Sequence, residues 1–316
     1  MTQAFRGILA MVGACTIWGL SPLYYKLLAH VPPPEVLSHR TLWSVILFAG
    51  VLAVQGRLSE IGTAFRGRRQ VGVIALAAAM ISVNWFVFIL SVQIGRTTEA
   101  SLGYYIFPLM TVFVGWLWFG ERLGIAQWGA VALALAAVLV LTVGLGVTPW
   151  ISLILATSFA VYGALKKGLA LGPVVSVTCE ILIYLPFWLV LLAWYHGNGQ
   201  GHFGTGWQTS LLLVLSGPLT AVPLILFSYA ARRVRLSTVG VLQYINPTLQ
   251  FFCAVLAFGE PFTLWHQIAF ALIWSAVAIF SFAALSQDRA ARRASIAALG
   301  VSAQIRNSPS EGSAKP

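Results

Sequence analysis

The sequence predicts an all-α polytopic membrane protein of ten transmembrane helices, arranged as two inverted repeats of five helices each. Three observations predict it. The 316 residues are 59% hydrophobic and only 9% charged, which leaves too few polar side chains to cover a soluble globule. Apolar residues come in continuous runs near the ~20 residues that a helix needs to cross a bilayer. A stretch of sequence in the first half also returns, in altered form, in the second half.

The apolar runs are separated by short polar or Gly/Pro-rich pauses, which mark the ends of the helices. A transmembrane β-barrel would instead show segments of about ten residues that alternate apolar and polar side chains. The expected spans are 7–28, 37–54, 71–93, 100–118, 125–145, 149–171, 174–195, 209–231, 238–258 and 262–285.

The repeated stretch runs from Gly103 to Glu121 and again from Leu242 to Glu260, with eight identical residues in nineteen. The shared residues include Tyr105/Tyr244, Pro108/Pro247 and a Phe-Gly-Glu triplet that ends at Glu121 and Glu260. Five spans separate the copies, and an odd number makes the second copy enter the membrane from the opposite side. The sequence therefore predicts a first repeat over 1–146, an inverted repeat over 147–285 and a tail over 286–316.

The basic residues are distributed unevenly about the predicted membrane. If the N-terminus is cytoplasmic, 16 of the 19 Lys and Arg residues fall on the inner side, and only Lys26, Arg40 and Arg96 do not. This is the positive-inside pattern, which accounts for the pI near 10.1 without a nucleic-acid partner. It predicts that both termini are cytoplasmic and that the basic, largely disordered tail begins against membrane lipids.

Two symmetric prolines suggest where a cavity lies. Pro108 and Pro247 each fall about nine residues into a span, where they would free the carbonyls of Tyr104 and Gln243 from helical hydrogen bonds. Backbone freed at this depth is tolerated only against protein or a water-filled cavity. A structural kink is the alternative, since prolines are frequent in membrane helices. The symmetric placement favours helix breaks at a cavity.

Several motifs resemble one family of permeases. They are "WGLSPLYYK", "SHRTLW", "NWFVFI", "SLGYYIFPL" and "FGERL" in the first half, with "YINP" and "FGE" in the second. They are similar to a RarD-like permease of the EamA type, in the drug/metabolite transporter superfamily, over about residues 5–285. The resemblance implies ten helices in two inverted repeats and a secondary transporter of small organic solutes in the bacterial inner membrane. It does not name the solute or the direction of transport.

Two charged residues within spans are the leading candidates for binding solute. Arg40 lies in the second span and Glu180 at nearly the matching position of the seventh. Charges at such depth are costly unless they face a cavity or a partner. Because the repeats are inverted, the two lie on the order of 12 Å apart in depth, so a direct ion pair needs long reach or a bridging water. The alternatives are that Arg40 snorkels and that Glu180 pairs with a helix terminus.

Other side chains are candidates by their polarity and depth. The candidate lining of the binding site, besides Arg40 and Glu180, is Lys26, Asn84, Tyr105, Gln243, Tyr244 and Asn246. The amides are equally suited to cross-linking helices, the tyrosines to aromatic packing, and Lys26 to snorkelling. Glu121 and Glu260 are expected to be structural, because a carboxylate at a helix N-terminus interacts favourably with the helix dipole.

An intramembrane enzyme is the competing class. A magnesium-dependent prenyl transferase needs clustered aspartates, and the only aspartate is Asp288, in the tail. No GxSxG elbow, P-loop or metal-ligand spacing occurs either. We therefore expect no enzyme, cofactor or metal, while a receptor or scaffold stays open. The sequence also leaves open proton coupling through Glu180, whose burial would favour the protonated form, and a homodimer.

Overall fold

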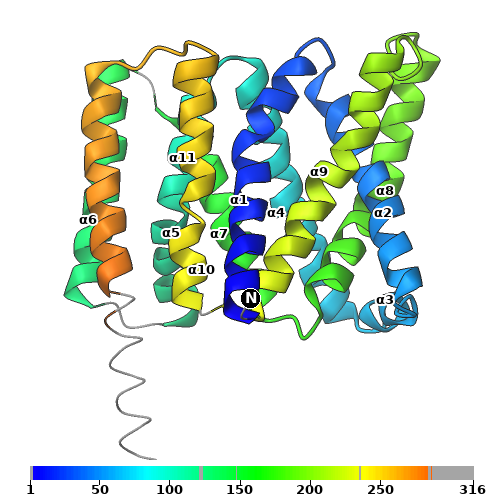
Figure 1. Cartoon of the computed structure of the whole chain (residues 1–316), viewed down its shortest axis with the longest axis horizontal. Helices are drawn as coiled ribbons and strands as arrows, with labels where there is room; N and C mark the ends of the chain where they lie inside the picture. The colour runs from blue at the N-terminus through cyan, green and yellow to red at the C-terminus, as the bar shows by residue number, and fades with distance from the viewer. Residues whose placement is uncertain (1–2, 121–123, 147, 235, 284–285, 287–316) are drawn as a thin grey trace, which may run out of the picture.

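The computed structural model describes residues 3–120, 124–146, 148–234, 236–283 and 286. Within these residues the chain forms helices and no strand (Figure 1). The helices are α1 (Gln3–Leu27), α2 (Pro33–Val54), α3 (Ser59–Ala64), α4 (Arg68–Gln93), α5 (Thr97–Phe119), α6 (Ile125–Leu145), α7 (Trp150–Lys167), α8 (Pro173–Gly197), α9 (Trp207–Ala231), α10 (Leu236–Leu242) and α11 (Ile245–Phe252). A π-helical turn η1 (Cys253–Ala257) follows α11, and a last helix spans Leu264–Ala283.

Nine segments of the described chain are long and apolar enough to cross a membrane, with α10, α11 and η1 counted as a single segment. The expected sixth span is not among them. Its helix, α7, ends at Lys167 instead of residue 171 and has only 18 residues, with two lysines in its last turn. The short α3 was not expected, and it lies between two spans rather than in one.

The offset between the two copies of the repeated stretch also relates the starts of three pairs of helices. The helices α4, α5 and α6 begin at Arg68, Thr97 and Ile125. The alignment that pairs Tyr105 with Tyr244 places these three starts on the first residues of α9, α10 and the last helix. Packing follows the same relation, because α1 packs against α9 and α11 while α7 packs against α4 and α5. The contacts of α1 with the second half therefore correspond to those of α7 with the first half, although α1 also packs against α4.

The long helices run in roughly the same direction and form one bundle (Figure 1). The last helix and α6 form one edge, α2 and α8 form the opposite edge, and α1, α4 and α7 lie between them. The start of α1 and the short α3 lie at the lower face, whereas the connection from α1 to α2 lies at the upper face. The middle of the bundle is thus built by helices from both halves.

Glycines allow two of these helix pairs to approach closely. A Cβ at Gly217 of α9 would lie 2.6 Å from the backbone of Trp43 in α2, and a Cβ at Gly103 of α5 would lie 2.9 Å from the carbonyl oxygen of Ser152 in α7. Only glycine fits such contacts, as is typical of small residues between membrane helices. These contacts bring the two halves together around a central cavity.

Candidate functional site

A cavity of about 360 Å³ lies in the middle of the bundle, a volume within the range of small-molecule sites. Its charged lining residues are Arg40 and Lys166, and none of the described residues that line it is acidic. Much of the remaining wall is aromatic, including Trp18, Trp85, Phe107, Phe159, Tyr162 and Phe227. The cavity is therefore cationic and aromatic.

Arg40 projects from α2 into this cavity and is 5% exposed. Its Nη1 donates a hydrogen bond to the hydroxyl of Tyr25 at 2.8 Å, and its guanidinium carbon lies 4.1 Å from the ring centroid of Trp85. Its Nε is buried without a partner. No ion pair among the described residues includes Arg40. Because a buried cation is costly without an opposite charge, this guanidinium is suited to an anion that enters the cavity.

Glu180 lies behind the cavity wall and pairs with Lys166 rather than with Arg40. Its two oxygens accept hydrogen bonds from Lys166 Nζ at 2.6 Å, Ser176 Oγ at 2.9 Å and Tyr162 Oη at 3.0 Å. The carboxylate is only 2% exposed and is not among the lining residues. Glu180 therefore holds a second cation, Lys166, at the edge of the cavity.

Lys166 was missed from the sequence because it was counted with the cytoplasmic basic residues. The available signal was its position inside the expected span 149–171, directly before the span that carries Glu180. Tyr25 and Tyr104 also line the cavity and were not selected. A tyrosine in a membrane helix packs equally well against lipid, protein or ligand, so its residue type gave no indication of the cavity.

Asn84 lines the cavity and also joins three helices. Its Nδ2 donates to the carbonyl of Leu155 at 3.0 Å and to Ser158 Oγ at 3.1 Å, both in α7. Its Oδ1 accepts a hydrogen bond from Tyr104 Oη of α5 at 2.9 Å. The amide therefore cross-links α4, α5 and α7.

The two prolines line the cavity but behave differently. The helix α5 continues through Pro108, so the helix break expected there is absent. The break expected near Pro247 is present, because Gln243 and Tyr244 separate α10 from α11. Pro247 has no N–H to give the carbonyl of Gln243 its α-helical hydrogen bond, and this carbonyl instead accepts a hydrogen bond from the backbone N–H of Asn246 at 3.1 Å. A bond to the third residue, rather than the fourth, satisfies this carbonyl.

The amides Gln243 and Asn246, expected near mid-depth, line the cavity beside this break, and so does the candidate Tyr244. The Oδ1 of Asn246 accepts a hydrogen bond from Gln250 Nε2 at 2.9 Å. Gln250 Oε1 is buried without a partner, so it adds an unsatisfied acceptor to the same wall.

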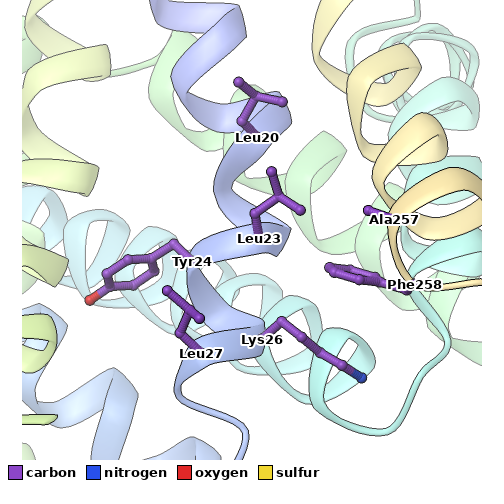
Figure 2. Close-up of a pocket in the computed structure, with 7 residues that line it drawn as sticks. All are labelled: Leu20, Leu23, Tyr24, Lys26, Leu27, Ala257 and Phe258. Carbon is purple, nitrogen blue, oxygen red and sulfur yellow. The ribbon is translucent and has the colours of Figure 1, made fainter. Parts of the chain in front are cut away.

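Tyr105 and Lys26 do not line the cavity. The Tyr105 ring stacks on Tyr244 with centroids 6.2 Å apart, and its hydroxyl lies 2.6 Å from Thr248 Oγ1. Its neighbour Tyr104 faces the cavity instead, because successive helical residues point about 100° apart. Lys26 lies in a separate groove on the outside of α1, with its amine near the ring of Phe258 (Figure 2).

Glu260 has a structural position, but on a different helix from the one expected. Its oxygens accept hydrogen bonds from the backbone N–H groups of Thr97 and Thr98 at 2.7 Å each, at the start of α5. The helix that follows Glu260 begins only at Leu264. A carboxylate at these free N–H groups caps α5 and interacts favourably with its dipole. Glu121, its repeat counterpart, lies outside the described residues.

The sequence of this chain matches a family of transporters and several bacterial relatives. The EamA-like transporter family matches residues 5–143. An uncharacterized transporter of Vibrio cholerae is 41% identical over 293 residues, which cover 92% of this chain and 97% of that protein. Protein RarD of Streptomyces exfoliatus is 43% identical, with 90% and 91% covered. The chain is a RarD-like member of the EamA family of permeases.

Protein RarD of Escherichia coli is 38% identical to this RarD-like permease, over 91% of this chain and 97% of that protein. A solved crystal structure matches with a TM-score of 0.58 at 19% identity, over 87% of this chain and 96% of the other. That likeness concerns the fold alone. The apolar helices and the relatives together indicate a multi-pass protein of the inner membrane. Among the described residues, no group of three or more His, Cys, Asp or Glu side chains could hold a metal ion.

Proposed function

We propose that this permease is a secondary transporter of a small organic anion, and that the solute binds in the central cavity. The observation that carries the proposal is Arg40, a buried guanidinium that faces the cavity and forms no ion pair with the described residues. A carboxylate on the solute would supply the missing charge, and the planar fork of Arg40 would donate two parallel hydrogen bonds to its oxygens.

The aromatic wall narrows the class of solute. Trp85 lies against the Arg40 guanidinium, and Phe159 and Tyr162 stack on one another farther along the cavity. A flat apolar or aromatic body would pack against these rings. An ammonium group would find no carboxylate among the described lining residues, so cations are disfavoured. The proposed substrate therefore joins a carboxylate to an apolar or aromatic body.

Alternating access would follow from two inverted five-helix repeats. The constant offset between the helix starts of the two halves and the corresponding contacts of α1 and α7 support this arrangement. In it α7 is the sixth crossing and brings the total to ten, although its helix has only 18 residues and carries two lysines in its last turn. Rocking of one repeat against the other would expose the cavity to each side in turn, and the helix break between α10 and α11 is suited to absorb part of that movement.

The Lys166–Glu180 pair supports a proposal of proton coupling. Protonation of Glu180 would release Lys166, which already lines the cavity, to attract the solute anion. Flux measured with and without an imposed pH gradient tests this proposal. Equal uphill flux in both conditions would eliminate coupling. Loss of the gradient's effect in Glu180→Gln, with downhill flux retained, would support it.

The orientation proposed for the chain places both termini in the cytoplasm. Arg57, Arg66, Arg68 and Arg69 lie around α3, which is at the same face as the start of α1 (Figure 1). Clustered basic residues favour the cytoplasmic side. The loop that joins α8 to α9 would then face the periplasm.

Flux in proteoliposomes tests the transport proposal. Purified protein would be reconstituted and offered three labelled solutes that share one ring: an aryl carboxylate, its neutral amide and the corresponding amine. The expected order of uptake is carboxylate, then amide, then amine, and Arg40→Gln should remove the preference. Specific binding without flux would overturn transport and favour the receptor alternative. Uptake of the amine ahead of the carboxylate would refute the proposed anion site.

A further inference from the structure

A groove on the outside of α1 is separate from the central cavity. It runs between α1 and the end of η1 (Figure 2), with Leu20, Leu23, Lys26 and Leu27 on one side and Ala257 and Phe258 on the other. None of the described residues that line it also lines the cavity. Whatever occupies this groove is therefore not in the proposed transport site.

The floor of the groove is apolar and uncovered by protein. Leu20, Leu23 and Leu27 follow helical spacing on one face of α1 and are 41%, 40% and 62% exposed. Such a face of a membrane helix lies against lipid chains. Ala257 leaves room on the opposite wall, because its side chain is small and exposed. The groove can thus accept an extended hydrocarbon chain.

The cation Lys26 lies at one end of this apolar floor, at the end nearer to the membrane surface. Lys26 lies in the last turn of α1, six residues after Leu20, which places it on the order of 9 Å nearer the helix end. Its Nζ lies 5.3 Å from the ring centroid of Phe258, and it takes part in no ion pair among the described residues. Lysines at this depth reach the level of lipid headgroups.

We infer that this groove is a binding site for an anionic phospholipid. The lipid phosphate would lie at Lys26 Nζ and an acyl chain would follow Leu23 and Leu20 past Ala257. Lys26 and the apolar floor lie next to one another, so a molecule with a charged head and a long apolar tail would contact both. Free phosphate would contact only Lys26. A zwitterionic lipid carries its own ammonium, which competes with Lys26 for the phosphate, so an anionic headgroup is favoured.

Photo-crosslinking tests this site without any measurement of transport. The full-length protein would be placed in phosphatidylcholine nanodiscs that contain a trace of phosphatidylglycerol with a diazirine on its acyl chain. Labelled peptides would be identified by mass spectrometry. We expect label on the α1 peptide that carries Leu20 and Leu23. In Lys26→Gln this label should fall about fivefold, and Lys26→Arg should retain it. The matched control is Arg57→Gln, a half-buried cation outside the groove, which should leave the label unchanged.

A second variant tests the tail of the lipid without altering charge. Ala257→Trp should fill the groove and remove the label, while size-exclusion chromatography checks that the protein is folded. Unchanged labelling in folded Lys26→Gln would overturn the headgroup assignment. Equal labelling by a diazirine phosphatidylcholine would overturn the preference for an anionic lipid. Displacement by millimolar inorganic phosphate would reveal a free-anion site and refute the lipid proposal.

Discussion

Replacement of Arg40 separates its charge from its geometry. Arg40→Gln removes the cation and keeps a polar side chain, whereas Arg40→Lys keeps the charge and loses the planar fork. Tyr25→Phe is the matched control, because it removes the hydroxyl that accepts the Nη1 hydrogen bond and leaves the guanidinium beside Trp85. The three variants therefore remove, one at a time, the charge, the planar fork and the Tyr25 hydroxyl at the same place in the cavity.

The size of the effect follows from the contacts of Arg40. A hydrogen bond to a charged group contributes about 1.5–3 kcal/mol, so loss of the cation should weaken anion binding by about 3 kcal/mol, or roughly a hundredfold. Arg40→Lys should cost roughly tenfold, since the point charge remains. Tyr25→Phe should cost less than either. Folding should persist in all three, because no ion pair among the described residues is broken.

Uptake and binding of a labelled aryl carboxylate by reconstituted protein would measure these effects, and thermal unfolding in detergent would monitor the fold. Normal transport by well-folded Arg40→Ala would refute the binding role. Loss of folding alone would support a structural role for the guanidinium. The exchange Arg40→Glu with Glu180→Arg should not restore transport, because Glu180 already bonds to Lys166.

Three further predictions follow from the fold. Glu260→Gln should lower stability by about 1–2 kcal/mol, because it weakens the cap on α5; an unchanged thermal midpoint would contradict the cap. Pro247→Ala should close the break between α10 and α11 and reduce flux more than Pro108→Ala, whose helix is already continuous; normal flux in both would make the prolines structural. An impermeant thiol reagent applied outside should label Asn198→Cys but not Gly67→Cys, and the opposite result would reverse the topology.

Much of the architecture was predictable from local sequence. The apolar runs indicated the helices, since a buried backbone in lipid must satisfy its hydrogen bonds internally. The repeat offset, read from Tyr105/Tyr244 and the Phe-Gly-Glu triplets, also relates the starts of α4 and α9. Arg40 was selected because a charge within a span is costly wherever it points. These properties depend on residue type and spacing along one segment, so the sequence alone determines them.

Only the tertiary structure decided which side chains meet. The partner of Glu180 is Lys166 on α7, the helix capped by Glu260 is α5, and Lys26 faces a groove outside the cavity. Hydropathy does not specify the rotation of a helix about its axis or the identity of its neighbours, because lipid and protein interiors are equally apolar. Close packing between segments far apart in sequence, such as Gly217 against Trp43, fixes the rotation and the neighbours of each helix. This packing determines which side chains face the cavity and which face the groove.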